Sequence, residues 1–160
     1  MVCGKNLLHI LASGAAEWNA FRDQNPDWVM LNGTCLPQAQ LAAADLHRAY
    51  LLASDLRGAN LEGVSLENAI LRKTNLRGCN LRHAKIDRAD LFDADLSSAD
   101  LREASMCSCF LVHADLRGAD LSTAHGLTLA QITRALGDDN TRLPDDLPRP
   151  SSWTAKGVPA

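Results

Sequence analysis

A solenoid is the fold that this sequence predicts, and three observations predict it. Leucine occupies every fifth position through most of the chain. A small residue precedes each of these leucines by two positions, and the residue between the two is usually Asp, Asn or Ser. A period of five fits neither the 3.6-residue turn of an α-helix nor the alternation of a flat strand. A stack of identical coils is therefore expected.

The repeat spans residues 29–123 as nineteen consecutive pentapeptides, of which the first two are degenerate. Each pentapeptide has an apolar central residue: Leu31, Leu36, Leu41, Leu46, Leu51, Leu56, Leu61, Leu66, Leu71, Leu76, Leu81, Ile86, Leu91, Leu96, Leu101, Met106, Leu111, Leu116 and Leu121. The residue two positions earlier is alanine in twelve pentapeptides, and otherwise Val29, Thr34, Ser54, Val64, Thr74, Cys79 or Cys109. Identical leucine layers explain how the chain manages with seven aromatic residues.

Residues 1–28 precede the repeat and are predicted to form a helix. Their apolar residues recur at helical spacing, and Asn25-Pro26 ends the pattern. The spaced residues are Leu7, Leu8, Ile10, Leu11, Ala15, Trp18 and Phe21.

Residues 124–160 follow the repeat and are predicted to form a second helix and an extended, irregular tail. Thr128 and Gln131 have the spacing of a capping box, and Gly137 suits the C′ position of that helix. Pro144, Pro148 and Pro150 mark the tail. Because a solenoid needs a cap at each end, we expect the flanking apolar residues to close the stack. These are Trp18, Phe21, Trp28, Leu129, Ile132 and Trp153.

Composition narrows the classes of partner. A chain of 160 residues forms one domain, and its net charge of −3 gives no reason to expect nucleic acid or an anionic membrane. No apolar run reaches the roughly 20 residues of a membrane span. Five cysteines without a C-x-x-C favour a reduced, cytoplasmic protein over a disulfide framework or a zinc site.

Seven pentapeptides match the pattern A-[DN]-L-x-x: those beginning at Ala44, Ala59, Ala89, Ala94, Ala99, Ala114 and Ala119. With this pattern the chain resembles the pentapeptide-repeat family over nineteen units, or 95 of 160 residues. The flanking segments Glu17–Arg22 with Asn25-Pro26, and Gly126–Thr128 with Gly137–Thr141 and Arg149-Pro150, resemble those of many bacterial members.

The resemblance implies an all-β solenoid, a right-handed quadrilateral β-helix with one pentapeptide per side. It implies about 4–5 coils and a length of roughly 23 Å at the usual spacing between strands, with an N-terminal capping helix and a C-terminal capping helix plus tail. The position before each central residue is then expected to face outward and be polar. Its large apolar exceptions are Met30, Tyr50, Ile70 and Phe110, all separated by multiples of 20. Four scattered exceptions would rarely share one side in four, so the sequence itself supports a 20-residue coil.

These exceptions predict an exposed apolar stripe along one side of the solenoid. With their neighbours two residues further on, the candidate partner-binding residues are Met30, Tyr50, Leu52, Ile70, Phe92, Phe110 and Val112. An exposed apolar patch usually marks a contact surface. Two readings remain open: a terminal segment folds back over the stripe, or a partner or a second copy binds it.

The other sides are polar. Arginines form one ladder beside a row of Asp and Asn, which predicts a solvated, self-neutralising face, with binding of phosphate or nucleic acid as the alternative. The ladder is Arg57, Arg77 and Arg117, and the row is Asp55, Asn75, Asp95 and Asp115. The remaining two sides carry mixed charges.

Nothing in the sequence supports catalysis. The histidines His9, His47, His83, His113 and His125 lack metal-ligand spacing, and nucleotide-binding and nucleophile motifs are absent. The sequence predicts no catalytic, cofactor or metal site and no small-molecule substrate.

Three functions remain for a non-catalytic solenoid. The first is a protein-interaction scaffold that binds an unidentified protein, or itself, through the apolar stripe. The second, implied by the resemblance, is a DNA mimic that modulates a type II topoisomerase such as gyrase. Mimicry needs an acidic surface, whereas residues 39–123 hold 12 Asp and Glu against 10 Lys and Arg. The third is a secreted effector, for which the sequence offers no test.

Overall fold

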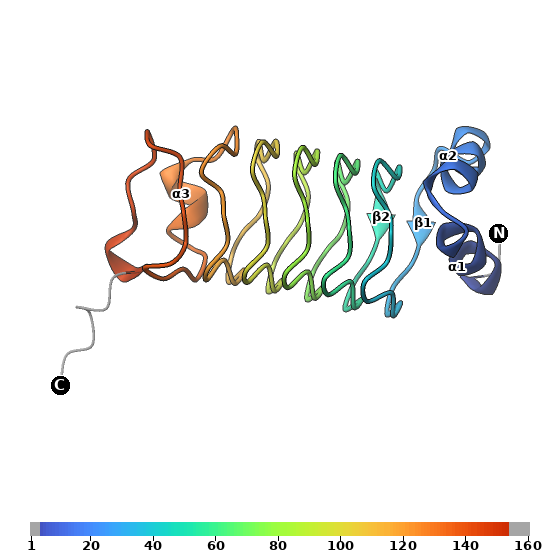
Figure 1. Cartoon of the computed structure of the whole chain (residues 1–160), viewed down its shortest axis with the longest axis horizontal. Helices are drawn as coiled ribbons and strands as arrows, with labels where there is room; N and C mark the ends of the chain where they lie inside the picture. The colour runs from blue at the N-terminus through green and yellow to red at the C-terminus, as the bar shows by residue number, and fades with distance from the viewer. Residues whose placement is uncertain (1–3, 154–160) are drawn as a thin grey trace.

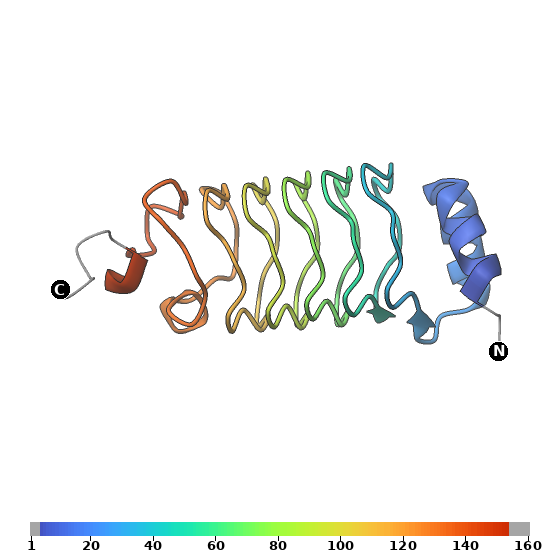
Figure 2. The ribbon, with the colours of Figure 1, turned by 90° about the horizontal axis from the view of Figure 1, so that it is seen from below.

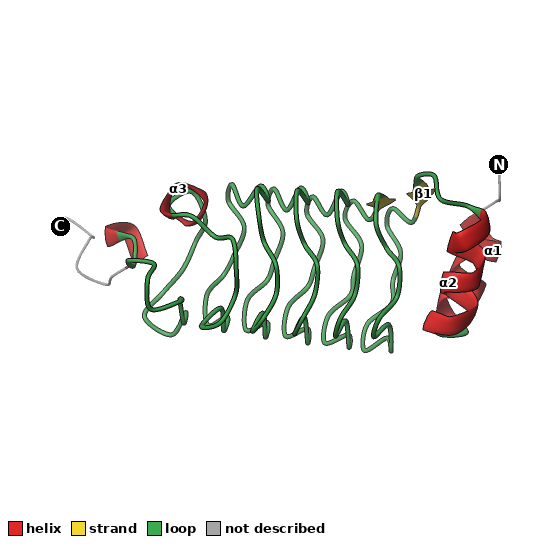
Figure 3. Cartoon of the chain, turned by 90° about the horizontal axis from the view of Figure 1, so that it is seen from above, coloured by secondary structure: helices red, strands yellow, loops and turns green. Residues whose placement is uncertain are grey.

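The computed structural model describes residues 4–153, which form a long stack of coils with helical segments at both ends (Figure 1). Its elements are α1 (Gly4–Ala12), α2 (Ala15–Gln24), β1 (Val29–Met30), β2 (Ala49–Tyr50), α3 (Leu129–Ile132) and the 3-10 helix η1 (Ser151–Trp153). Between β2 and α3 the coils consist of turns joined by single β-bridges (Figure 3).

The prediction of one helix in residues 1–28 is wrong, because the structure has two. Ser13 and Gly14 separate them, and Gly14 has φ +119°, which favours glycine because side chains with a Cβ rarely adopt it. Helix α2 ends at Gln24, immediately before the predicted stop at Asn25-Pro26. Together α1 and α2 lie at the N-terminal end of the stack (Figure 2).

Parallel bridges join each coil to the next at a spacing of 20 residues. One row of bridges runs through Asp55, Asn75, Asp95 and Asp115, and each other side has its own row. Backbone hydrogen bonds between coils are 2.7–3.1 Å long, in the ordinary range. The predicted 20-residue coil is confirmed.

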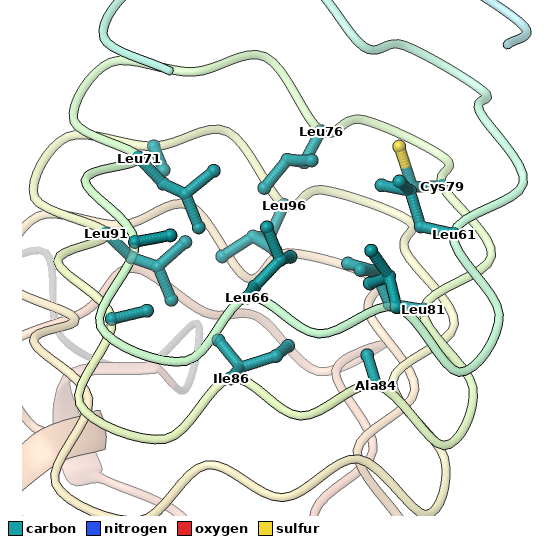
Figure 4. Packing of buried hydrophobic residues seen from close by; sticks show 14 of the residues in the cluster. Leu61, Leu66, Leu71, Leu76, Cys79, Leu81, Ala84, Ile86, Leu91 and Leu96 are labelled. Atoms are coloured by element: carbon teal, nitrogen blue, oxygen red, sulfur yellow. The ribbon is translucent and has the colours of Figure 1, made fainter. Parts of the chain in front are cut away.

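The core is the column of central residues. From Leu41 to Leu121 each is at most 1% exposed, and Figure 4 shows successive layers stacked along the axis. Two polar residues at the small position, Ser54 and Thr74, also fit because their side chains find backbone acceptors. The Ser54 hydroxyl donates to the Leu31 carbonyl at 2.9 Å, and the Thr74 hydroxyl donates to that of Leu51 at 2.6 Å.

Each corner of the coil requires a left-handed backbone. The second residue after every central residue, from Gly33 to Gly118, has φ between 54° and 67°. A positive φ at the third residue of a four-residue turn is the mark of type II. This position holds no Val, Ile or Thr before Thr123, consistent with the cost of β-branched side chains in that conformation. Thr123 has no positive φ, and the regular repeat ends there.

The C-terminal segment departs from the predicted helix and tail. Helix α3 begins as predicted, with both hydrogen bonds of the capping box between Thr128 and Gln131. It ends at Ile132, so Gly137 is not its C′ residue. The chain then resumes the coil, because Leu136 pairs with Asp115 and Arg142 pairs with Asp120. The predicted irregular tail is therefore wrong for the part that contains these bridges.

Trp153 compensates for a missing leucine in this last part of the coil. By its place after Leu136, Gly137 stands where a central leucine would be. A Cβ on Gly137 would lie 2.3 Å from the Trp153 ring, which is buried. The indole therefore occupies the space beside Gly137 that a leucine side chain fills in the other layers.

We predict that Ser98→Val destabilises the fold by about 1–3 kcal/mol, because a β-branched residue must adopt a positive φ there. Ser97→Val, one residue earlier in the same turn, is the matched control and is expected to be close to neutral. Urea unfolding followed by circular dichroism measures both. Equal losses in the two variants would contradict the role assigned to the corner backbone.

Candidate interaction surfaces

The structure places all seven predicted stripe residues on one side of the solenoid. Tyr50, Ile70, Asp90 and Phe110 form one row of bridges, so their side chains stand in a column. Met30 is 56% exposed, Leu52 41% and Phe110 61%. The remaining four (Tyr50, Ile70, Phe92 and Val112) are partly buried. Each coil thus contributes at least one apolar side chain to the stripe, and Asp90 interrupts the first row.

Described terminal segments do not bury the stripe. Helices α1 and α2 lie at the N-terminal end of the stack and η1 at the C-terminal end (Figure 3). Trp28 touches the stripe at its edge, with its ring 4.8 Å from that of Tyr50 and the residue itself 46% exposed. The sequence predicts that Trp28 closes the end of the stack, whereas in the structure it packs beside Tyr50 and extends the apolar stripe. The five-residue pattern could not predict the exposure of Trp28, because Trp28 precedes the first repeat.

Polar side chains on the stripe side compensate one another. Arg72 Nε donates to Asp90 Oδ2 at 2.6 Å, and the guanidinium carbon lies 5.8 Å from the Phe92 ring centre. Asp93 Oδ1 lies 3.2 Å from His113 Nδ1. The sequence pattern marked the apolar residues but missed the Arg72–Asp90 pair, because its members are 18 residues apart.

The arginine side holds two local ion pairs. Arg57 and Arg117 each contact the aspartate two residues earlier, at 2.7 Å to Asp55 and 2.5 Å to Asp115. Hydrogen bonds from Arg117 lower the pKa of Asp115, and Arg57 lowers that of Asp55 in the same way. Arg77 stands beside Asn75, whose side-chain oxygen accepts from the Arg77 backbone N–H. Neighbouring carboxylates leave this side without the surplus positive charge that a phosphate site needs.

The two buried cysteines, Cys79 and Cys109, keep their thiols protonated. Burial raises the pKa of Cys79 to about 11 and that of Cys109 to about 12, so both are protonated at neutral pH. Among residues 4–153, no group of three or more His, Cys, Asp or Glu is arranged to hold a metal ion. None of the helices in that range is long and apolar enough to cross a membrane.

Inward leucines at every fifth residue and bridges at every twentieth define a β-helical solenoid. The family model for pentapeptide repeats matches residues 28–63, 59–97 and 86–122, with eight copies. The chain belongs to the pentapeptide-repeat family, and its solenoid is a right-handed β-helix.

One solved structure agrees on the fold, and two others have lower structural similarity. A pentapeptide repeat protein from the Arabidopsis thaliana thylakoid lumen is 23% identical, with a TM-score of 0.54, over 56% of this chain and 62% of that one. The chain thus spans under two thirds of that structure. HetL, a Nostoc pentapeptide repeat protein involved in regulating heterocyst differentiation, is 26% identical over 72% of this chain and 70% of its own, with a TM-score of 0.32. QnrB1, a plasmid-mediated fluoroquinolone resistance protein, is 16% identical over 79% and 78%, with a TM-score of 0.35. No curated protein matches by sequence.

We predict that Asp115→Asn removes a pH-dependent contribution to stability. Because the folded-state pKa of Asp115 lies below its unfolded value of about 3.9, the Asp115–Arg117 pair stabilises the fold above about pH 4 and loses its effect as the pH falls through the folded-state pKa. The Arg117 side chain is 60% exposed to solvent, so the loss at pH 7 is expected to stay under about 1 kcal/mol.

Urea unfolding at pH 7 and at pH 2.5 measures the difference between Asp115→Asn and the parent chain. An asparagine oxygen can still accept from the Arg117 backbone N–H, as Asn75 does for Arg77, so the substitution isolates the charge. Asn75→Asp is the matched converse and is expected to add a pH-dependent gain beside Arg77. An equal loss for Asp115→Asn at both pH values would contradict the prediction.

Proposed function

We propose that this protein is a non-catalytic interaction scaffold whose apolar stripe binds a macromolecular partner. The observation that carries the proposal is the exposure of Met30, Leu52 and Phe110 on one side of a rigid stack. Contiguous apolar surface of this kind on a folded chain usually marks a binding site. Because the core is filled with leucine, the partner must bind an outer face.

We also propose that the flanking segments cap the two ends of the stack. At the N-terminal end, α2 supplies the hydrogen bonds that a preceding coil would make to one side. Trp18 Nε1 donates to the Asp45 carbonyl at 2.6 Å, Asn19 Oδ1 accepts from the Asp45 N–H at 2.7 Å, and Arg22 donates to the His47 carbonyl at 3.0 Å. These hydrogen bonds satisfy the outer backbone N–H and carbonyl groups of the first coil, which could otherwise pair with another chain.

The C-terminal end also uses a tryptophan and an arginine. Trp153 Nε1 donates to the Ala135 carbonyl at 3.0 Å, and Arg149 donates to the carbonyls of Thr141, at 2.8 Å, and of Asp138. A tryptophan indole and an arginine guanidinium thus stand in for missing backbone N–H groups at both ends. The proposed units are the N-terminal cap 1–28, the β-helix 29–123 and the C-terminal segment 124–160, although residues 1–3 and 154–160 lie outside the described part.

The scaffold is favoured over a DNA mimic by the arrangement of charge. A mimic needs an uninterrupted row of negative charge, whereas here arginines alternate with aspartates along the same sides. Arg57 and Arg117 have side chains that are 55% and 60% exposed, so they would repel a basic DNA-binding groove. The secreted effector remains an alternative function. We propose that the protein acts in the reducing cytoplasm, because Cys79 and Cys109 act as buried apolar groups.

The stripe is tested by replacing Tyr50, Ile70 and Phe110 together with Ser. We expect the far-UV spectrum of the β-helix to persist while capture of a partner from a lysate of the source cells is lost. Leu129→Ser, at an exposed position on α3, is the control. Unfolding of the triple variant would show that these residues belong to the core and contradict the proposal. Protection of gyrase from a quinolone in a supercoiling assay would favour the mimic instead.

The caps are tested by Trp18→Phe, which keeps most of the buried ring but removes its N–H donor to Asp45. The Asp45 carbonyl is left without this donor, at a cost of about 1–3 kcal/mol in unfolding free energy. Trp28→Phe is the control, since Trp28 is half exposed. Thermal unfolding of both variants provides the comparison, and a Trp18→Phe chain as stable as the control would refute the capping role.

A further inference from the structure

We propose that the partner of the apolar stripe is a second copy of this chain, packed face to face with the two solenoids parallel. The inference rests on the proposed function and names its partner. It starts from two columns of outward side chains. The first column is Met30, Tyr50, Ile70, Asp90 and Phe110, and the second column is Asn32, Leu52, Arg72, Phe92 and Val112. A rung is one residue from each column on the same coil.

A two-fold axis parallel to the solenoid and lying between the two faces exchanges these columns. Each rung then meets the same rung of the second copy. Tyr50 lies against Leu52 of the second copy, and Phe110 lies against Val112 of the second copy. Because both stacks repeat at the same spacing of about 4.8 Å, all five rungs stay in register along the contact. Such an interface uses the same patch on both subunits, as two-fold symmetry demands.

Charge and the overlap of the rungs together decide between parallel and antiparallel packing. Arg72 and Asp90 belong to different columns and to adjacent rungs, and they already pair within one chain at 2.6 Å. Exchanging the columns brings Arg72 into line with Asp90 of the second copy, one rung away, so two cations and two anions form a neutral cluster. An antiparallel pair centred on Ile70 would instead set Arg72 against Arg72. Shifting that pair by one rung relieves the clash but leaves Met30 without an opposing rung.

The size of the face sets the strength of the association. Five rungs span about 19 Å at the usual spacing, and the face is only two side-chain columns wide. Contacts of this size fall in the class below about 1,200 Å² of total buried area, which is typical of weak complexes. The half-exposed Trp28 adds apolar surface beside the first rung. A concentration-dependent dimer is expected rather than a permanent one.

Charge reversal tests the cluster. Light scattering at chain concentrations up to about 1 mM, a range suited to a weak dissociation constant, should show the mass rising from 17.3 kDa toward twice that value. Arg72→Asp and Asp90→Arg should each raise the dissociation constant at least tenfold, since like charges then meet across the interface. An equimolar mixture of the two single variants should dimerise again. In the mixture each chain still has like charges at its own positions 72 and 90. Only contacts between the two chains can therefore restore association.

An equimolar mixture of Tyr50→Cys and Leu52→Cys tests the orientation, in chains whose Cys3, Cys35 and Cys107 are replaced by Ser. Mild oxidation should cross-link the two variants to each other, because parallel packing sets position 50 of one copy against position 52 of the other on the same rung. Dimers that do not cross-link would overturn the parallel arrangement. A parent chain that stays monomeric up to 1 mM, or a mixture that fails to recover, would overturn the dimer. If the monomeric chain still captured another protein through the stripe, the proposed function would stand without the dimer.

Discussion

Hydrogen bonding between successive coils is the constraint on which the rest of the structure depends. Each coil must return to the same place after 20 residues, so every pentapeptide must turn by the same angle. A corner residue with positive φ makes that turn, and the leucine between two corners points to the axis. Changing the length of one pentapeptide would shift every later leucine out of the core. The five-residue period is therefore preserved from Leu31 to Leu121.

This constraint separates the inside of the molecule from its outside. The core layers are nearly identical, so the inward residues give no side or coil of the solenoid a distinct chemistry. Outward positions carry no such requirement, and each side has its own chemistry. Arginine and aspartate pair locally on one side, whereas Tyr50, Ile70 and Phe110 line another. The information about binding therefore lies in the positions that the fold leaves free.

The ends pose a different problem, because a stack of coils has no natural stop. Every coil presents N–H and carbonyl groups to its neighbour, and the first and last coils lack one neighbour. Trp18, Asn19 and Arg22 meet these groups at one end, and Arg149 and Trp153 meet them at the other. All five come from segments outside the repeat. We propose that this is why helical segments accompany so regular a core at both ends.

Periodicity in the sequence determined the coil length, the buried leucines and the side on which the apolar stripe lies. The buried leucines follow from spacing because every repeat meets the same surroundings, and the spacing of the apolar exceptions supports the coil length that the family resemblance implies. Tertiary structure determined the conformation of the segments that lie outside the five-residue repeat. Gly14 splits the N-terminal helix, and the coil resumes at Leu136 with Trp153 beside Gly137. The pairing of Arg72 with Asp90 was also decided in three dimensions. These contacts join residues distant in sequence or outside the repeat, so no local pattern could predict them.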